Sequence, residues 1–139
     1  MKVNYKLVLI IVSAVILGFA ILLVFNYLHH KGSFEIKIQN RTPEAIGALT
    51  ISYKKIDQDI MISGIPSWAS LTLVFKPREE FGENTMWLSY RDQKGVIHKE
   101  AVFGYFEKGY RGKAFIKIIK VESDGVIKFE IKSDVKAIY

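Results

Sequence analysis

The chain has 139 residues, no cysteine and a formal net charge of +6. Without cysteine it cannot form disulfides, zinc–thiolate sites or thiol nucleophiles, so its fold must be held by packing alone. Residues 33–139 contain seventeen Lys and Arg residues and fourteen Asp and Glu residues, so their formal net charge is +3. So small and dispersed a charge argues against nucleic-acid binding. Weak attraction to an anionic membrane surface or wall polymer is compatible with it but points to no particular residue.

The first element is an uninterrupted apolar segment at residues 7–25, in which Ser13 is the only polar side chain. As a helix of about 1.5 Å per residue it would cover about 28 Å, close to the roughly 30 Å of a bilayer's hydrocarbon core. We therefore predict a transmembrane helix over residues 7–28. A cleaved secretory signal is the alternative, but it needs a shorter apolar core and a small-x-small cleavage site, and neither is present.

The flanking charges predict how this segment is oriented. Lys2, Lys6 and the amino terminus precede it, whereas Lys31 is the first cation after it. Because cytoplasmic flanks carry the excess of Lys and Arg, residues 1–6 are expected in the cytoplasm. Residues 29–33 then form a linker, and residues 34–139 form one domain outside a single-pass plasma-membrane anchor.

The domain alternates apolar and polar residues with the period of half-buried strands. The pattern is clear in residues 34–39, 48–53, 70–76, 86–90 and 126–132, and residues 60–62 form a brief strand or edge segment. Trp87 should face away from the core, and each core residue replaced by alanine should cost about 2–5 kcal/mol. The inward positions include Phe34, Ile36, Ile38, Leu49, Ile51, Tyr53, Leu71, Leu73, Met86, Leu88, Tyr90, Ile127, Phe129 and Ile131.

Turn signals separate these segments at intervals of about 8 to 12 residues. Pro43 and Pro77 interrupt strand pairing, while Gly95 and Gly125 end two short polar stretches that are typical of hairpin turns. No helical pattern appears after the anchor. These features predict an all-β domain, an immunoglobulin-like two-sheet sandwich of seven or eight short antiparallel strands. A small β-barrel is the alternative.

Residues with catalytic potential are few. His98 shares a strand face with Glu100, but an exposed histidine on a strand is more often a surface residue than a general base. The glycine pattern of a nucleophile elbow is absent. Loop carboxylates occur without the spacing of a calcium loop. We predict no catalytic, metal-binding or cofactor-binding residues, and no enzyme activity.

The densest aromatic stretch is residues 103–112, which we predict to form a loop, with four aromatic residues and three glycines. Tyrosine and arginine often dominate binding energy, so Tyr105, Phe106, Tyr110 and Arg111 are the candidate partner-binding residues. Tyrosines at the corners of sandwiches also have structural roles, which leaves scaffold as the other interpretation. Trp68 is a further candidate, either as a plug of the core or as an exposed anchor.

The expected function is that of a membrane-anchored, extracytoplasmic, non-enzymatic binding or accessory module. It would contact another envelope protein or a wall component through its loops, because loops vary and keep free backbone groups while strands use theirs in ladders. Two alternatives remain: a small envelope enzyme that uses carboxylates and His98, and a toxin-protection protein of the same architecture.

Overall fold

The computed structural model describes residues 5–30, 32–78 and 80–137, without the side chains of residues 28–30. The chain divides into two compact units, residues 1–31 and 32–139, and we treat each by itself. Lys2 and Lys31, on which the predicted orientation depends, lie outside the described residues.

The first unit is one helix, α1 (Tyr5–His30). Its segment Tyr5–Tyr27 contains an 18-residue stretch with a mean hydropathy of 3.3 and is long and apolar enough to cross a membrane. Every side chain from Tyr5 to Tyr27 is exposed, and most of them are apolar. The hydroxyl of Ser13 donates to the carbonyl oxygen of Ile10 at 2.9 Å, which satisfies the one polar side chain of the predicted segment inside the helix itself.

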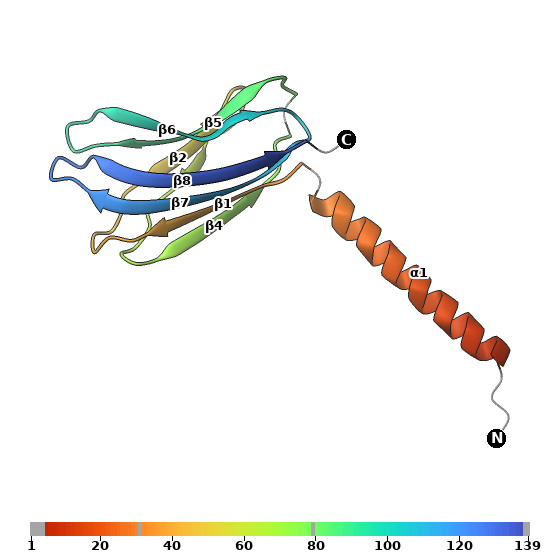
Figure 1. Cartoon of the computed structure of the whole chain (residues 1–139). Helices are drawn as coiled ribbons and strands as arrows, with labels where there is room; N and C mark the ends of the chain where they lie inside the picture. Colours follow the sequence, from red (N-terminus) through yellow and green to blue (C-terminus); the bar gives the residue numbers. More distant parts are fainter. Residues whose placement is uncertain (1–4, 31, 79, 138–139) are drawn as a thin grey trace. The chain divides into compact units, whose positions relative to one another are not determined.

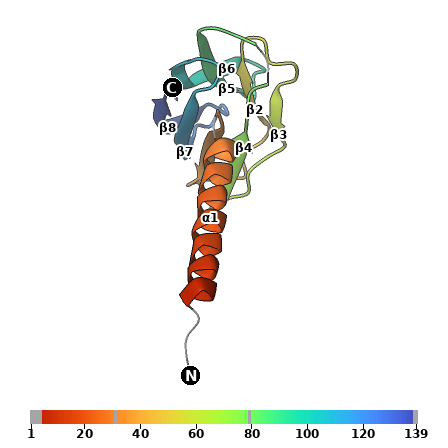
Figure 2. The same ribbon diagram turned by 90° about the vertical axis from the view of Figure 1, so that its right-hand side faces the viewer.

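The second unit is a sandwich of two four-stranded sheets (Figure 1). One sheet has the order β4-β1-β7-β8 and the other β3-β2-β5-β6. Figure 2 looks along the strands and separates the two layers. No closed barrel forms, so the sandwich prediction is confirmed. The strands are β1 (Phe34–Asn40), β2 (Leu49–Tyr53), β3 (Ile60–Ile62), β4 (Ser70–Phe75), β5 (Asn84–Arg91), β6 (Ile97–Phe106), β7 (Arg111–Val121) and β8 (Ile127–Lys136).

One strand pairing differs from the antiparallel arrangement that we predicted. Among the described strands, β1 and β7 pair in parallel, with Phe34 opposite Gly112 and Asn40 opposite Ile118, while the other pairings are antiparallel. Parallel neighbours need a long connection, and here five strands lie between them in the chain. Alternation along one strand reports its faces and says nothing of its neighbour's direction.

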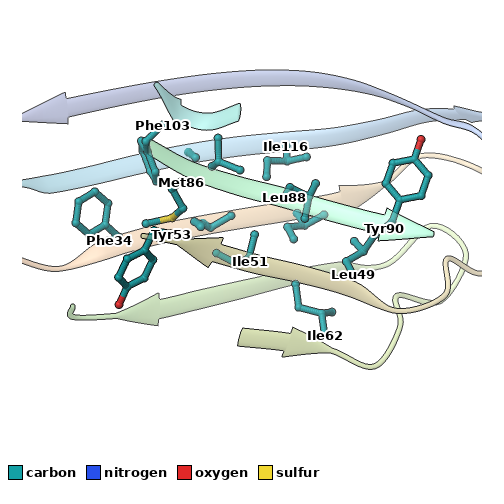
Figure 3. Close-up of a cluster of buried hydrophobic side chains, with 14 of the residues drawn as sticks. Phe34, Leu49, Ile51, Tyr53, Ile62, Met86, Leu88, Tyr90, Phe103 and Ile116 are labelled. Atoms are coloured by element: carbon teal, nitrogen blue, oxygen red, sulfur yellow. The ribbon is translucent and has the colours of Figure 1, made fainter. Parts of the chain in front are cut away.

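The core lies between the sheets, where the alternating positions of β1, β2 and β5 meet. Phe34, Ile36, Ile38, Leu49, Ile51, Tyr53, Met86, Leu88 and Tyr90 are all buried, as predicted. Figure 3 shows Phe34, Tyr53, Met86 and Phe103 gathered toward one end of this core and Tyr90 beside Leu49 toward the other. Trp87 points outward and is partly exposed, also as predicted.

Four residues expected in the core are only half-buried. Leu71 and Leu73 on β4, and Phe129 and Ile131 on β8, pack against the core without being enclosed by it. The reason is that β4 and β8 are the two edge strands of their sheet, so one flank of each side chain has no neighbouring strand. Ile127 and Leu88 are buried, as expected.

The sandwich has two ends, which carry different connections. The chain enters at Phe34, and at this entry end lie the β2–β3, β4–β5 and β6–β7 connections. At the opposite, far end lie the β1–β2 connection (residues 41–48), the β3–β4 connection (63–69) and the hairpin turns 92–96 and 122–126 (Figure 1). Gly95 and Gly125 in these turns have φ values of 83° and 85°, the left-handed conformation expected of them.

Candidate functional site

Among the described residues of the sandwich, the most exposed aromatic residue is at the far end. Trp68 belongs to the β3–β4 connection, which crosses from one sheet to the other, and its side chain is 65% exposed. Of the two sequence-based interpretations, plug of the core or exposed anchor, this placement corresponds to the exposed anchor. An indole that is exposed to water does not contribute the free energy of burial that it would contribute in the core.

The backbone of Trp68 is also unusual, with a φ of 59°. The amide of Ala69 donates to the carbonyl oxygen of Pro66 at 3.2 Å, so Pro66 to Ala69 form a tight turn with Trp68 as its third residue. A positive φ at that position is ordinarily supplied by glycine or asparagine, and for a bulky residue it costs of order 1–3 kcal/mol. The fold therefore holds an exposed tryptophan in a conformation that a smaller residue would adopt at lower cost.

The buried side-chain amide of Asn40 holds the base of the turn formed by Pro66 to Ala69. Asn40, at the end of β1, is fully buried, and its Nδ2 donates to the carbonyl oxygens of Glu44 at 2.8 Å, Pro66 at 3.0 Å and Ile65 at 3.3 Å. Its Oδ1 accepts from the backbone amide and the hydroxyl of Thr42 at 3.0 and 2.8 Å. One side chain thus ties the end of β1 to two of the far-end connections, residues 41–48 and 63–69.

Backbone pairing and burial strengthen the same attachment. Ile46 and Ile65 form an isolated antiparallel bridge, with N–H···O distances of 2.9 and 3.0 Å, and both side chains are buried. The residues around Trp68 are therefore held at their base while Pro66, Ser67 and Trp68 remain exposed. A side chain on such a fixed backbone can bind a partner with less loss of backbone conformational entropy.

The aromatic stretch 103–112, expected to be a loop, is mostly strand. β6 continues to Phe106 and β7 begins at Arg111, which leaves a turn of four residues at the entry end. This turn is closed by the amide of Tyr110 donating to the carbonyl oxygen of Glu107 at 3.1 Å, with Gly109 at a φ of 85°. The bulge where β6 pairs with β5 places two consecutive residues, Val102 and Phe103, in the core, a change of alternation that sequence reading did not anticipate.

The four candidate residues of this stretch do not share one surface. Phe106 is fully buried, with its ring 4.9 Å from that of Phe34, so we leave it out of any binding surface. Tyr105 is 47% exposed, and Tyr110, half-buried, packs against it with ring centroids 6.1 Å apart. The Tyr105 hydroxyl donates to the Glu107 carboxylate, and this hydrogen bond raises the pKa of Tyr105. Arg111 is exposed at the start of β7.

Gly112, at the end of the stretch, has a packing role. A Cβ at this position would come within 2.7 Å of the Phe34 ring and 2.9 Å of the Phe103 ring. Glycine is needed here because two core rings approach its backbone closely. The glycine and aromatic density of residues 103–112 thus owes much to core packing at the entry end.

A shallow pocket of about 460 Å³ lies on the outer face of the β3-β2-β5-β6 sheet, beside Tyr105. Trp87 and Thr85 of β5 line it, together with Gly104 of β6 and the side chains of Lys54 and Glu83. The pocket is open to solvent.

The sequence-based catalytic alternative centred on His98, and the structure gives this residue a partner. Nε2 of His98 lies 2.9 Å from Oδ2 of Asp92, and its ring stacks on Tyr90 with centroids 5.0 Å apart. The other oxygen of Asp92 accepts from the amides of Lys94 and Val96 at 2.9 and 2.8 Å. The Asp92 side chain is only 4% exposed, and the hydrogen bond from His98 is the main cause that lowers its pKa.

The hydrogen bond between His98 and Asp92 spans the 92–96 hairpin turn. Within residues 32–78 and 80–137, the side-chain hydrogen-bond partner of His98 is Asp92, and no hydroxyl is hydrogen-bonded to its ring. Throughout the described part of the chain, no three His, Asp or Glu side chains are arranged to hold a metal ion.

Sequence reasoning missed the long-range contacts of two residues at the far end. Asparagine at a turn is expected to close a local side-chain turn, and Asn40 does so by accepting from the amide of Thr42. Its contact 26 residues along the chain leaves no local pattern. The sequence does indicate a turn at Asp92, because Asp followed by Gly three residues later is typical of a capped turn. The hydrogen bond between Asp92 and His98, however, depends on the register of the strands.

Comparison with known proteins adds little. No protein-family model matches the chain, and no curated protein matches it. An NMR structure of a protein from Eubacterium rectale resembles it with a TM-score of 0.43 and 14% sequence identity, covering 73% of this chain and 89% of that one. A likeness this distant indicates nothing about function.

Proposed function

We propose that this protein is a membrane-anchored, extracytoplasmic, non-enzymatic binding module, and that it contacts another protein of the cell envelope through the Trp68 turn. The turn comprises Pro66 to Ala69. The observation that carries the proposal is an exposed tryptophan held at a positive φ on a base fixed by Asn40.

The anchor rests on the surface of α1. Its apolar side chains would be costly to expose to water over a segment of 23 residues, and the hydrocarbon core of a bilayer removes that cost. The satisfied hydroxyl of Ser13 presents no obstacle to such burial. The excess of Lys before the segment supports an outward-facing domain.

The binding role rests on how residues of this kind behave in interfaces. Backbone strain persists where the surroundings impose it, and it gathers at functional positions. Tryptophan is among the residues that most often dominate binding energy, and removing such an anchor costs about 2 kcal/mol or more, roughly thirtyfold in affinity. A tryptophan that is both strained and exposed serves neither the core nor the turn, which leaves contact with a partner as its use.

The decisive experiment replaces Trp68 with glycine in the full-length, membrane-embedded protein. Glycine suits a φ of 59°, so Trp68→Gly should keep or slightly raise the melting temperature while it abolishes chemical crosslinking of the domain to envelope proteins. Trp87→Ala is the matched control, because it removes the other tryptophan from an exposed sheet face. It should leave the crosslinks intact.

Two results would count against the proposal. A clear drop in melting temperature with Trp68→Gly would show that the indole stabilises the fold, and unchanged crosslinks would show that it contacts no partner. Crosslinks that form only with an added secreted toxin would select the toxin-protection alternative. Turnover of a substrate that His98→Ala abolishes would select the enzyme alternative.

A further inference from the structure

The positive charge of the domain gathers on the outer face of the β4-β1-β7-β8 sheet. Inward residues of β1 and β7 alternate with outward ones, and on β8 the charged residues alternate with the half-buried ones. Within the described strands, the outward carboxylates of this face are Glu35, Glu130 and Asp134. The outward cations are Lys37, Arg111, Lys113, Lys117, Lys120, Lys128, Lys132 and Lys136, and we call these eight side chains the basic face.

Each carboxylate on this surface already has a lysine. Glu35 pairs with Lys113 at 3.1 Å, Glu130 with Lys117 at 3.6 Å, and Asp134 with Lys136 at 3.4 Å. Lys120 of the basic face pairs with Glu122 of the neighbouring turn at 2.9 Å. Four cations of the basic face therefore have no carboxylate partner among the described residues: Lys37, Arg111, Lys128 and Lys132.

The middle of the basic face is built around Phe115. Its neighbour on β1 is Lys37 and its neighbour on β8 is Lys132, so two unpaired lysines flank one half-buried ring. The ammonium groups of Lys37 and Lys117 lie 5.9 and 5.6 Å from the ring centroid, within range of cation–π attraction. Two strand spacings separate Lys37 from Lys132, which places their Cα atoms about 10 Å apart.

Strand pairing adds an electrostatic cost to this arrangement. Arg111 is directly opposite Lys136, and Lys120 is directly opposite Lys128, in the register of β7 and β8. Like charges in such positions destabilise a sheet. Lysines on an edge strand such as β8 prevent pairing with other chains, but β1 and β7 lie inside the sheet, so edge protection does not account for Lys37 or Arg111.

We propose that the basic face binds a linear, phosphodiester-linked anionic polymer of the cell wall. The unpaired cations extend from Arg111, opposite Lys136, to Lys128, eight residues along β8, a distance of about 26 Å. One small anion cannot reach over that length, whereas a repeating polyanion can meet the cations in succession. The face has one half-buried ring and no row of exposed aromatic residues, so it lacks the stacking surface of a single-stranded nucleic-acid site.

The test uses the full-length chain in non-ionic detergent and fluorescently labelled poly(glycerol phosphate) as the probe. Binding is measured by anisotropy over a range of NaCl concentrations. The double variant Lys37→Gln, Lys132→Gln should weaken binding about tenfold and lower the slope of log affinity against log salt by about one to two. The matched control Lys54→Gln, Lys99→Gln removes the same charge elsewhere on the domain and should change affinity less than about twofold.

Four outcomes would overturn this inference: no binding of the polymer, equal weakening by both double variants, binding that salt does not reduce, or binding to vesicles of anionic phospholipid without binding to the polymer. The last would identify the basic face as a membrane-facing surface. Melting temperatures of both variants show whether a loss of affinity reflects a loss of fold. Trp68→Gly should bind the polymer normally, so failure here and failure of the proposed protein contact are separate results.

Discussion

At the scale of single residues, the far end depends on buried polar groups that satisfy one another. Asn40 satisfies three carbonyl oxygens and two Thr42 donors from a fully buried position. No buried side-chain nitrogen or oxygen of the described residues is left without a hydrogen-bond partner. Such a network is sensitive to the loss of one member, because each group left unpaired keeps its desolvation cost.

Asn40→Ala should therefore lower the free energy of unfolding by about 3 kcal/mol, and it should mobilise the residues around Trp68. Gln39→Ala, one position away on the outward side of β1, is the control and should cost less than about 1 kcal/mol. Urea denaturation followed by tryptophan fluorescence measures both. Equal stabilities for the two variants would mean that Asn40 does not hold the far end together.

Asp92 makes stability depend on pH at the same scale. The hydrogen bond from His98 lowers the pKa of Asp92 below its ordinary value of 3.8, so the folded state favours the ionised carboxylate. Its stabilisation is then complete well above pH 3.8 and is lost as the pH falls through the lower, folded-state pKa. Asp92→Asn should flatten the decline of melting temperature between about pH 5 and 2. Asp59→Asn, an exposed loop change, should leave that decline as in the parent protein.

At the scale of elements, position within a sheet decides how much a core residue contributes. Leu88 lies on β5, between β2 and β6, and is fully buried, whereas Ile131 lies on the edge strand β8 and is half-buried. Both residues occupy inward positions of alternating segments. Their sequence patterns are equivalent, and only the order of the strands separates them.

Leu88→Ala should cost about 2–5 kcal/mol, as for other enclosed core residues, while Ile131→Ala should cost roughly half as much. The physical reason is that less apolar surface leaves water at the edge position, and the space left by truncation opens to solvent. Urea denaturation with unchanged m-values checks the difference. A cost for Ile131→Ala equal to that for Leu88→Ala would mean that β8 is covered in solution.

At the scale of the whole molecule, an apolar helix precedes a sandwich with its own core. We expect the protein to fractionate with membranes, and protease added to intact spheroplasts should remove the domain and leave α1. The hydropathy of Tyr5–Tyr27 and the Lys excess before it are the reasons.

Lysed spheroplasts provide the control, because protease then reaches both sides of the membrane. A domain protected until lysis would reverse the orientation. A free domain with a new amino terminus would favour the cleaved-signal alternative.

The sequence alone was sufficient for features that depend on local pattern. A long apolar run, strict alternation and glycine-ended turns are set by neighbours in the chain, so they predicted α1, the sandwich, the buried face of β1, β2 and β5, and the turns at Gly95 and Gly125. Trp68 and Phe106 were both identified as candidates, but their local sequence could not tell the exposed ring from the buried one.

Tertiary structure decided the rest, because the remaining features join residues far apart in the chain. Strand order made β4 and β8 edges, and the parallel pairing of β1 with β7 placed Lys37 beside Phe115. The register of β7 and β8 put Lys132 on the other side of that ring. Through these pairings, cations that are dispersed along the sequence of a domain with a net charge of +3 lie together on the basic face. Alternation assigns a residue to a face of its strand, but only the pairing of strands decides which charges share that face.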